Sequence, residues 1–65
     1  MQVAALVTDI HPVDGLAIEY MIKWACVDGH SGHFVSTTGK DSTSLATYLN
    51  ENYSIAVTSD EVQWI

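Results

Sequence analysis

The sequence predicts an α+β fold, a small curved antiparallel sheet of four to five strands with one helix packed on it, in the order β-β-β-α-β. Three observations predict it. Residues 16–27 alternate with the period of a strand, a later segment carries an apolar stripe with the period of a helix, and Gly, Pro and Asp punctuate the chain between such segments. One helix on an antiparallel sheet is the simplest arrangement that buries these faces. A small open barrel with the helix across one end is the close variant.

The first expected strand covers residues 3–10, which are rich in small and β-branched side chains. It is followed by Pro12, which has no N–H to donate to a sheet, and by the dipeptide Asp14-Gly15. Asp-Gly favours a tight turn because glycine tolerates a positive φ. We therefore expect a turn between the first two strands.

The second segment, residues 16–27, is the most informative. Side chains alternate between the two faces of a strand, so its even-numbered positions share one face. That face is apolar or amphipathic throughout: Leu16, Ile18, Tyr20, Ile22, Trp24 and Cys26. The charges of Glu19 and Lys23 fall on the other face; their i, i+4 spacing also supports a helix. The β-branched and aromatic content favours the strand.

A turn is expected over residues 28–32, where glycine and aspartate recur, and a third strand over residues 33–38, antiparallel to the second. Asp41 or Ser42 can then cap a helix, because either side chain accepts an unpaired N–H of a first helical turn.

The helix is expected over residues 42–51. Its apolar side chains recur at helical spacing and form one stripe: Leu45, Tyr48, Leu49 and Tyr53. Residues 55–57 predict a fourth strand. After a polar turn, residues 62–65 alternate again and predict a short last strand.

Length and composition favour one small binding domain over residues 1–65. A chain of this size buries only about 60% of the surface that its unfolded form exposes. Hydrophobic residues nevertheless make up 48% of the chain and charged residues only 15%. Some apolar side chains must therefore lie at the surface, and exposed apolar patches commonly mark interaction sites.

The charge balance narrows the class of partner. Eight acidic residues face two lysines and no arginine, which gives a formal charge of −6. Neutralising nucleic-acid phosphates needs a basic surface, so a nucleic-acid partner is excluded, and an anionic membrane is disfavoured for the same reason. An acidic protein attracts basic partners. The single cysteine, Cys26, cannot form an internal disulfide, and we expect a cytoplasmic protein.

Neither a metal nor a cofactor is expected. Cys26, His30 and His33 could hold Zn²⁺ with Asp28 or His11 as a fourth ligand, and a metal-dependent mini-domain is a third hypothesis for function. The position of Cys26 on the apolar strand face favours a simple buried thiol. No nucleophile elbow or phosphate loop stands out, and so short a chain has little room for a substrate pocket. We therefore predict that the protein is not an enzyme.

The leading hypothesis is a small acidic inhibitor or modulator, of the phage or mobile-element type, that occupies the surface of a host protein. The expected binding residues are Trp64, Asp60, Glu61, Trp24 and Tyr20. Aromatic residues are enriched where binding energy concentrates, and carboxylates steer a basic partner. The alternative hypothesis is a homo-oligomer, such as a homodimer, that binds a small ligand between subunits.

Overall fold

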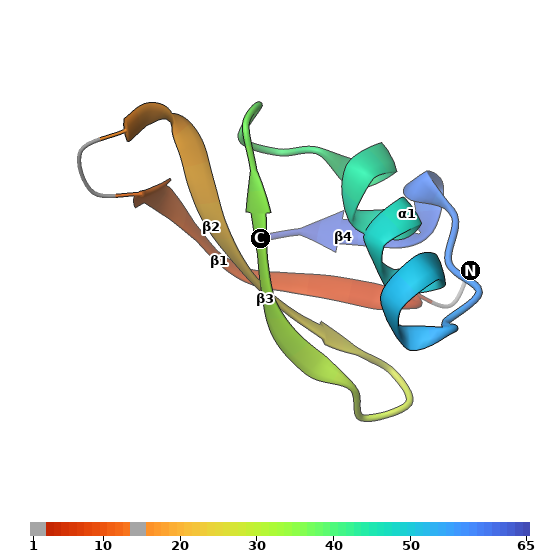
Figure 1. Cartoon of the computed structure of the whole chain (residues 1–65). Coiled ribbons are helices and arrows are strands. Elements are labelled where there is room, and N and C mark those ends of the chain that lie inside the picture. Colours follow the sequence, from red (N-terminus) through yellow and green to blue (C-terminus); the bar gives the residue numbers. More distant parts are fainter. Residues whose placement is uncertain (1–2, 14–15) are drawn as a thin grey trace.

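The structure is a computed structural model that describes residues 3–13 and 16–65. Its elements in chain order are β1 (Ala5–Val13), β2 (Leu16–Cys26), β3 (Ser31–Ser36), α1 (Ser42–Tyr53), the short 3₁₀ helix η1 (Ser59–Glu61) and β4 (Val62–Trp64). The predicted α+β class and the order β-β-β-α-β are confirmed (Figure 1). The predicted Asp14-Gly15 turn lies outside the described residues.

The four strands form one sheet in the spatial order β3-β2-β1-β4. The first three strands are antiparallel, as predicted, whereas β4 joins β1 in parallel with Ala5 opposite Val62 and Val7 opposite Trp64. The sheet is therefore mixed. The reason is the connection: after α1 the chain returns to the beginning of β1, so that β4 then runs alongside β1 in the same direction (Figure 1).

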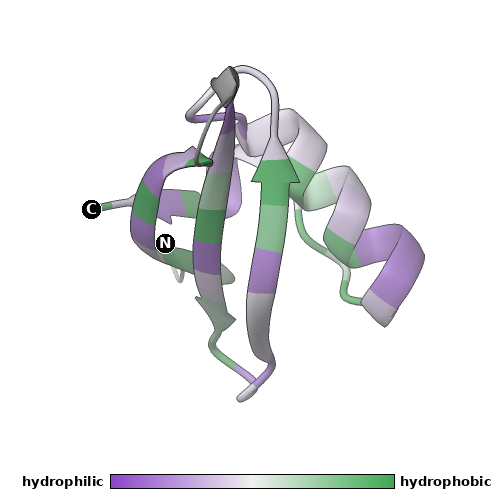
Figure 2. Cartoon of the chain, turned by 60° about the vertical axis from the view of Figure 1, so that its left-hand side comes forward, coloured by the Kyte–Doolittle hydropathy of each residue, from purple (hydrophilic) through white to green (hydrophobic). Residues whose placement is uncertain are grey.

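The alternation predicted for β2 is confirmed where its side chains are described. Ile22 and Trp24 are at most 1% exposed and Cys26 is 9% exposed, so the even positions from Ile22 onward form the inner face. Lys23 and Val27 are exposed. Apolar and polar residues alternate along the strands in Figure 2, with α1 to one side of the sheet. Among residues 3–13 and 16–65, no helix covers the opposite, outer face of the sheet.

β1 is longer than predicted, because it continues to Val13 and includes Pro12 opposite Tyr20. β4 pairs only with Ala5–Val7, so Pro12 lies where β1 has a neighbour on one side alone, and proline is tolerated at such edge positions.

A register shift in β1 falls at Thr8, whose hydroxyl donates to the Lys23 carbonyl at 3.2 Å. The shift is a β-bulge, a device that increases local twist.

β3 begins at Ser31 and ends at Ser36, so the predicted strand over residues 33–38 is displaced by two residues. The turn before β3 is tighter than expected. Gly29 adopts a φ of 98°, which glycine tolerates, and the Cys26 N–H donates to the His30 carbonyl at 2.7 Å. β3 therefore pairs with β2 directly after the turn, beginning at Ser31 opposite Ala25.

α1 forms where it was predicted and runs two residues further, to Tyr53. Asp41 caps its beginning by accepting from the Ser44 N–H at 3.0 Å, and the left-handed Ser54, with a φ of 56°, ends it. Leu45 and Leu49 face the sheet with no exposed surface.

Replacing Asp41 by alanine is expected to lower the free energy of unfolding by about 1 kcal/mol at neutral pH, because a helix N–H loses its acceptor. The backbone and side-chain hydrogen bonds of Ser44, and then that of Thr38, hold the pKa of Asp41 below its ordinary value. A lowered folded-state pKa stabilises the protein at neutral pH, and that stability is lost as the pH falls through it. The alanine penalty should therefore shrink in acid. D41N, which keeps the cap, should stay near wild type at pH 7 in urea unfolding; a loss equal to that of D41A would contradict this role.

The predicted strand over residues 55–57 is wrong. This stretch is an irregular connection with no strand partner in the described part of the chain. Val57 is buried, but its carbonyl accepts from the Asn50 side-chain amide at 2.8 Å. A side chain of α1 thus takes the place of a sheet ladder.

One apolar core joins the inner face of the sheet to α1. Its members are Ala5, Val7, Ile22, Trp24, Cys26, Leu45, Ala46, Leu49, Val57 and Val62. The accessible surface is 4069 Å². A compact monomer of this mass is expected to expose about 4,100 Å², so the chain is as compact as a folded monomer of its size. In the described residues, neither helix combines the length and the apolar character that crossing a membrane requires.

Candidate binding surface

Trp24 does not belong to the binding surface, which corrects the prediction made for it. Its side chain is 1% exposed, and its ring meets Tyr53 edge to face with centroids 5.2 Å apart. Trp24 is buried because it lies on the inner face of β2, where the register places it opposite both Val7 and Gly32. Its indole N–H has no hydrogen-bond acceptor among the described residues. Trp24 is a core residue.

Trp64 and Tyr20 are half-buried and held by contacts within the chain. Trp64 lies on the inner face of the sheet, and its indole N–H donates to the Ser42 hydroxyl at 2.7 Å, which ties β4 to the beginning of α1. Tyr20 lies over Gly39, where a Cβ added to the glycine would be in ordinary van der Waals contact with the ring, at 3.5 Å. These two residues sit on different parts of the fold.

Asp60 and Glu61 form the surface turn η1. The Thr58 hydroxyl lies 2.6 Å from Asp60 Oδ1 and 2.9 Å from Glu61 Oε1, and the Thr58 N–H donates to Glu61 at 3.0 Å. The hydrogen bond from Thr58 lowers the pKa of Asp60 below its ordinary value. Of the predicted binding residues, these two carboxylates make the clearest charged feature of the surface.

Two further carboxylates lie at the same end of the molecule, which we call the acidic end: Asp28, Glu51, Asp60 and Glu61. The backbone connects the parts. The Ala4 N–H donates to the Glu61 carbonyl at 3.2 Å, and the Val27 N–H donates to the Ala4 carbonyl at 3.3 Å. The turn after β2 and η1 therefore flank the start of β1 on its two sides.

The C-terminal part of α1 reaches this end as well. The rings of His30 and Tyr53 are 6.2 Å apart, which brings the turn after β2 next to the last turn of the helix, where Glu51 is exposed. Unpaired carbonyls at a helix C-terminus carry a partial negative charge. The carbonyls at the end of α1 and the four carboxylates therefore both contribute negative potential to this end of the molecule.

The two lysines do not balance the acidic end. Lys23 stands opposite Asp9 in the β1–β2 register, and Lys40 immediately precedes Asp41. Each lysine has a carboxylate neighbour of its own, so neither balances the acidic end. The charge of the molecule is therefore polarised, and such a field steers a cationic partner toward one end.

The side chains of His30 and Asp28 form a hydrogen bond in the turn after β2. The His30 ring nitrogen lies 2.8 Å from Asp28 Oδ1, and the His30 N–H donates to the same oxygen at 3.2 Å. These hydrogen bonds from His30 lower the pKa of Asp28. Both side chains are about half exposed, so the pair stays accessible to a partner.

An apolar hollow of about 250 Å³ opens on the outer face of the sheet beside the acidic end. It is lined by Val3, Leu6, Ala25, Cys26, Val27 and Gln63. Leu6 and Ala25 face outward opposite each other in the β1–β2 register, and Gln63 of β4 stands on the other side of Leu6. Val27 is 63% exposed at its rim. Three strands build the hollow, and sequence reasoning missed it.

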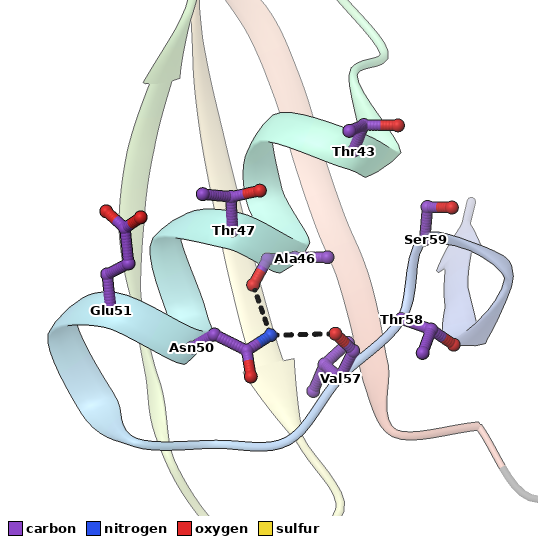
Figure 3. A pocket seen from close by; sticks show the side chains of 8 residues that line it. All are labelled: Thr43, Ala46, Thr47, Asn50, Glu51, Val57, Thr58 and Ser59. Carbon is purple, nitrogen blue, oxygen red and sulfur yellow. Dashed lines mark hydrogen bonds between the residues drawn. The ribbon is translucent and has the colours of Figure 1, made fainter.

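A second, more polar groove of about 330 Å³ runs between α1 and the chain that follows it (Figure 3). Its lining is Thr43, Ala46, Thr47, Asn50, Glu51, Val57, Thr58 and Ser59. The Asn50 amide lies between α1 and the connection and donates to the Ala46 and Val57 carbonyls at 2.8 Å each. These hydrogen bonds hold the connection against α1. We therefore interpret the groove as a packing boundary between two segments of the fold and not as a binding site.

The side chains considered for a metal are not gathered. Cys26 lies on the inner face of β2, whereas His33 stands opposite Lys23 on the outer face. Burial, and then Asp28, raises the pKa of the Cys26 thiol, which disfavours the thiolate that zinc binds. Within residues 3–13 and 16–65, no three His, Cys, Asp or Glu side chains converge on one point.

Comparison with protein-family models, with curated proteins and with solved structures finds no match to this chain. The interpretation of function therefore rests on the acidic end and the apolar hollow.

Proposed function

We propose that the chain is a non-catalytic binding protein that docks with its acidic end on a basic surface of another protein. One observation carries the proposal: four carboxylates, Asp28, Glu51, Asp60 and Glu61, share an end of the molecule. In the form expected from the sequence, the partner is a host protein and the chain is an inhibitor or modulator of the phage or mobile-element type, which acts by covering that surface.

Physical chemistry supports a steering role for this end. Complementary charge raises the rate of encounter, and salt screens that effect. The Cys26 thiol, with its raised pKa and 9% exposure, lacks the properties of a catalytic nucleophile. A reducing cytoplasm, which suits a lone cysteine, is part of the proposal.

Removing two charges from the acidic end is expected to weaken binding of basic peptides about three- to tenfold at low salt. The probe is a set of lysine- and arginine-rich peptides selected from a random library on the immobilised full chain. The variant is E51Q/D60N, and the measurement is the dissociation constant by calorimetry at low and high salt.

The matched control, D9N/E19Q, also removes one Asp and one Glu charge but leaves the acidic end intact. It should bind within about twofold of wild type, because the charges it removes lie elsewhere on the sheet. A selection without enrichment of basic residues, or equal losses for the two double variants, would refute the proposed function.

A further inference from the structure

We propose that the apolar hollow is an anchor site, which takes one large apolar side chain from a basic peptide segment of the partner. This inference rests on the proposed function and deepens it. The acidic end brings the segment to the surface, and the hollow holds it there by burying apolar area.

The size of the hollow fits a single side chain. Its volume is about 250 Å³. A cavity of about 150 Å³ lined by apolar side chains is known to hold benzene, whereas drug-sized ligands occupy about 300–1,000 Å³. A leucine, methionine or phenylalanine side chain therefore suits it better than a whole small-molecule ligand.

The lining of the hollow is chemically suited to that occupant. Leu6, Ala25 and Val27 supply apolar walls, and the most exposed of them, Val27, gains most from being covered. Gln63 is exposed at the edge, where its amide can both donate to and accept from a peptide backbone. The face that holds the hollow is the one that α1 leaves uncovered (Figure 2).

The flanking charges determine the class of occupant. Asp28 directly follows Val27 on one side of the hollow, Glu61 lies two residues before Gln63 on another, and the one nearby lysine, Lys23, lies two residues before Ala25 on the outer face. An apolar side chain flanked by lysine or arginine would place cations beside both carboxylates. A nucleic acid or an anionic lipid would meet repulsion there, and so would a second copy of a chain with a charge of −6.

The test uses two synthetic probes and the full ¹⁵N-labelled chain. One probe is a peptide with a single leucine between lysines; the other has serine in place of that leucine. We expect saturable amide shifts at Leu6, Ala25, Val27 and Gln63 with the leucine peptide, and binding of the serine peptide about tenfold weaker, because the buried apolar area is lost.

A pair of matched variants locates the anchor. V27S removes the apolar rim of the hollow, and V35S makes the same change at Val35, which is 49% exposed on the outer face of β3 and does not line the hollow. We expect V27S to bind the leucine peptide about fivefold to tenfold more weakly and V35S to bind it as wild type does. Both positions are exposed, and the amide spectrum of each free variant verifies its fold.

The outcomes separate the two proposals. If the leucine peptide shifts only residues around η1 and Glu51, and V27S binds it as tightly as wild type, the anchor site is refuted and the proposed function stands. If the two peptides bind equally well, the anchor site is refuted as well. If neither lysine-containing peptide binds at low salt, the anchor site and the proposed function both fail.

Discussion

Replacing Trp24 by alanine is expected to cost about 3–5 kcal/mol of folding free energy, which is the range for removing a buried aromatic side chain. Trp24 is 1% exposed and is the largest side chain among the fully buried ones. A chain of 65 residues has a total stability of only about 3–10 kcal/mol. W24A should therefore lose a large part of this stability, and at the lower end of that range it should be unfolded at 25 °C, as measured by circular dichroism with urea titration.

Trp24→Phe is the informative companion. Phenylalanine keeps an aromatic ring against Tyr53 and removes an indole N–H that has no acceptor in the described structure. Its cost should therefore fall well below that of W24A, at about 1–2 kcal/mol, because part of the lost packing is offset by the removal of an unsatisfied donor. If W24A stayed folded with a loss below about 1 kcal/mol, Trp24 would not be a core residue.

Replacing Leu49 by alanine is expected to have the second large effect, a loss of about 2–5 kcal/mol in the free energy of unfolding. Leu49 has no exposed surface, and it lies on the helix face that packs against the sheet. Its carbonyl also receives the Ile55 N–H at 3.3 Å, where α1 ends. Losing the side chain leaves a cavity between helix and sheet that a core this small cannot easily close.

The control for L49A is Thr47→Ala, on the exposed side of the same helix. Alanine has the higher helix propensity, so T47A should change the unfolding free energy by less than about 0.5 kcal/mol or stabilise the protein slightly. Urea unfolding of both variants checks this. Similar losses for L49A and T47A would mean that α1 does not pack on the sheet through Leu49.

The sequence predicts well which side chains of β2 and α1 are buried. Ile22, Trp24 and Cys26 recur every second residue, and Leu45 and Leu49 recur with the helical period; in the structure, these five side chains form much of the core. Such patterns are local, and burial of one face enforces them.

Elements that depend on distant parts of the chain are harder to predict. Residues 55–57 have strand-like composition, but their hydrogen bonds go to α1, where Asn50 holds the Val57 carbonyl. The parallel direction of β4 follows from the path of the chain after the helix. No local sequence pattern predicts that path. The place of Pro12 within β1 is hard to predict for the same reason. A proline is tolerated there because β4 is too short to pair with that part of β1.

The binding surface was predictable only in part. Asp60 and Glu61 are in a polar turn, and the sequence indicates their exposure. The hollow depends on register, which sets Leu6 between Ala25 and Gln63. These residues come from three strands, so no single stretch of the sequence signals the patch. Trp24 was misassigned because a large aromatic residue serves equally well in a core and at an interface.

Site-specific photo-cross-linking tests the anchor most directly. A photoreactive phenylalanine analogue would replace Val27 in one sample of the full chain and Val35 in another, each irradiated with the leucine-containing lysine peptide at low salt. Cross-linking at position 27 that joins the peptide at or beside its leucine, with little product from position 35, is the predicted result. Equal products from the two positions, or a product from position 35 alone, would contradict an anchor in the hollow.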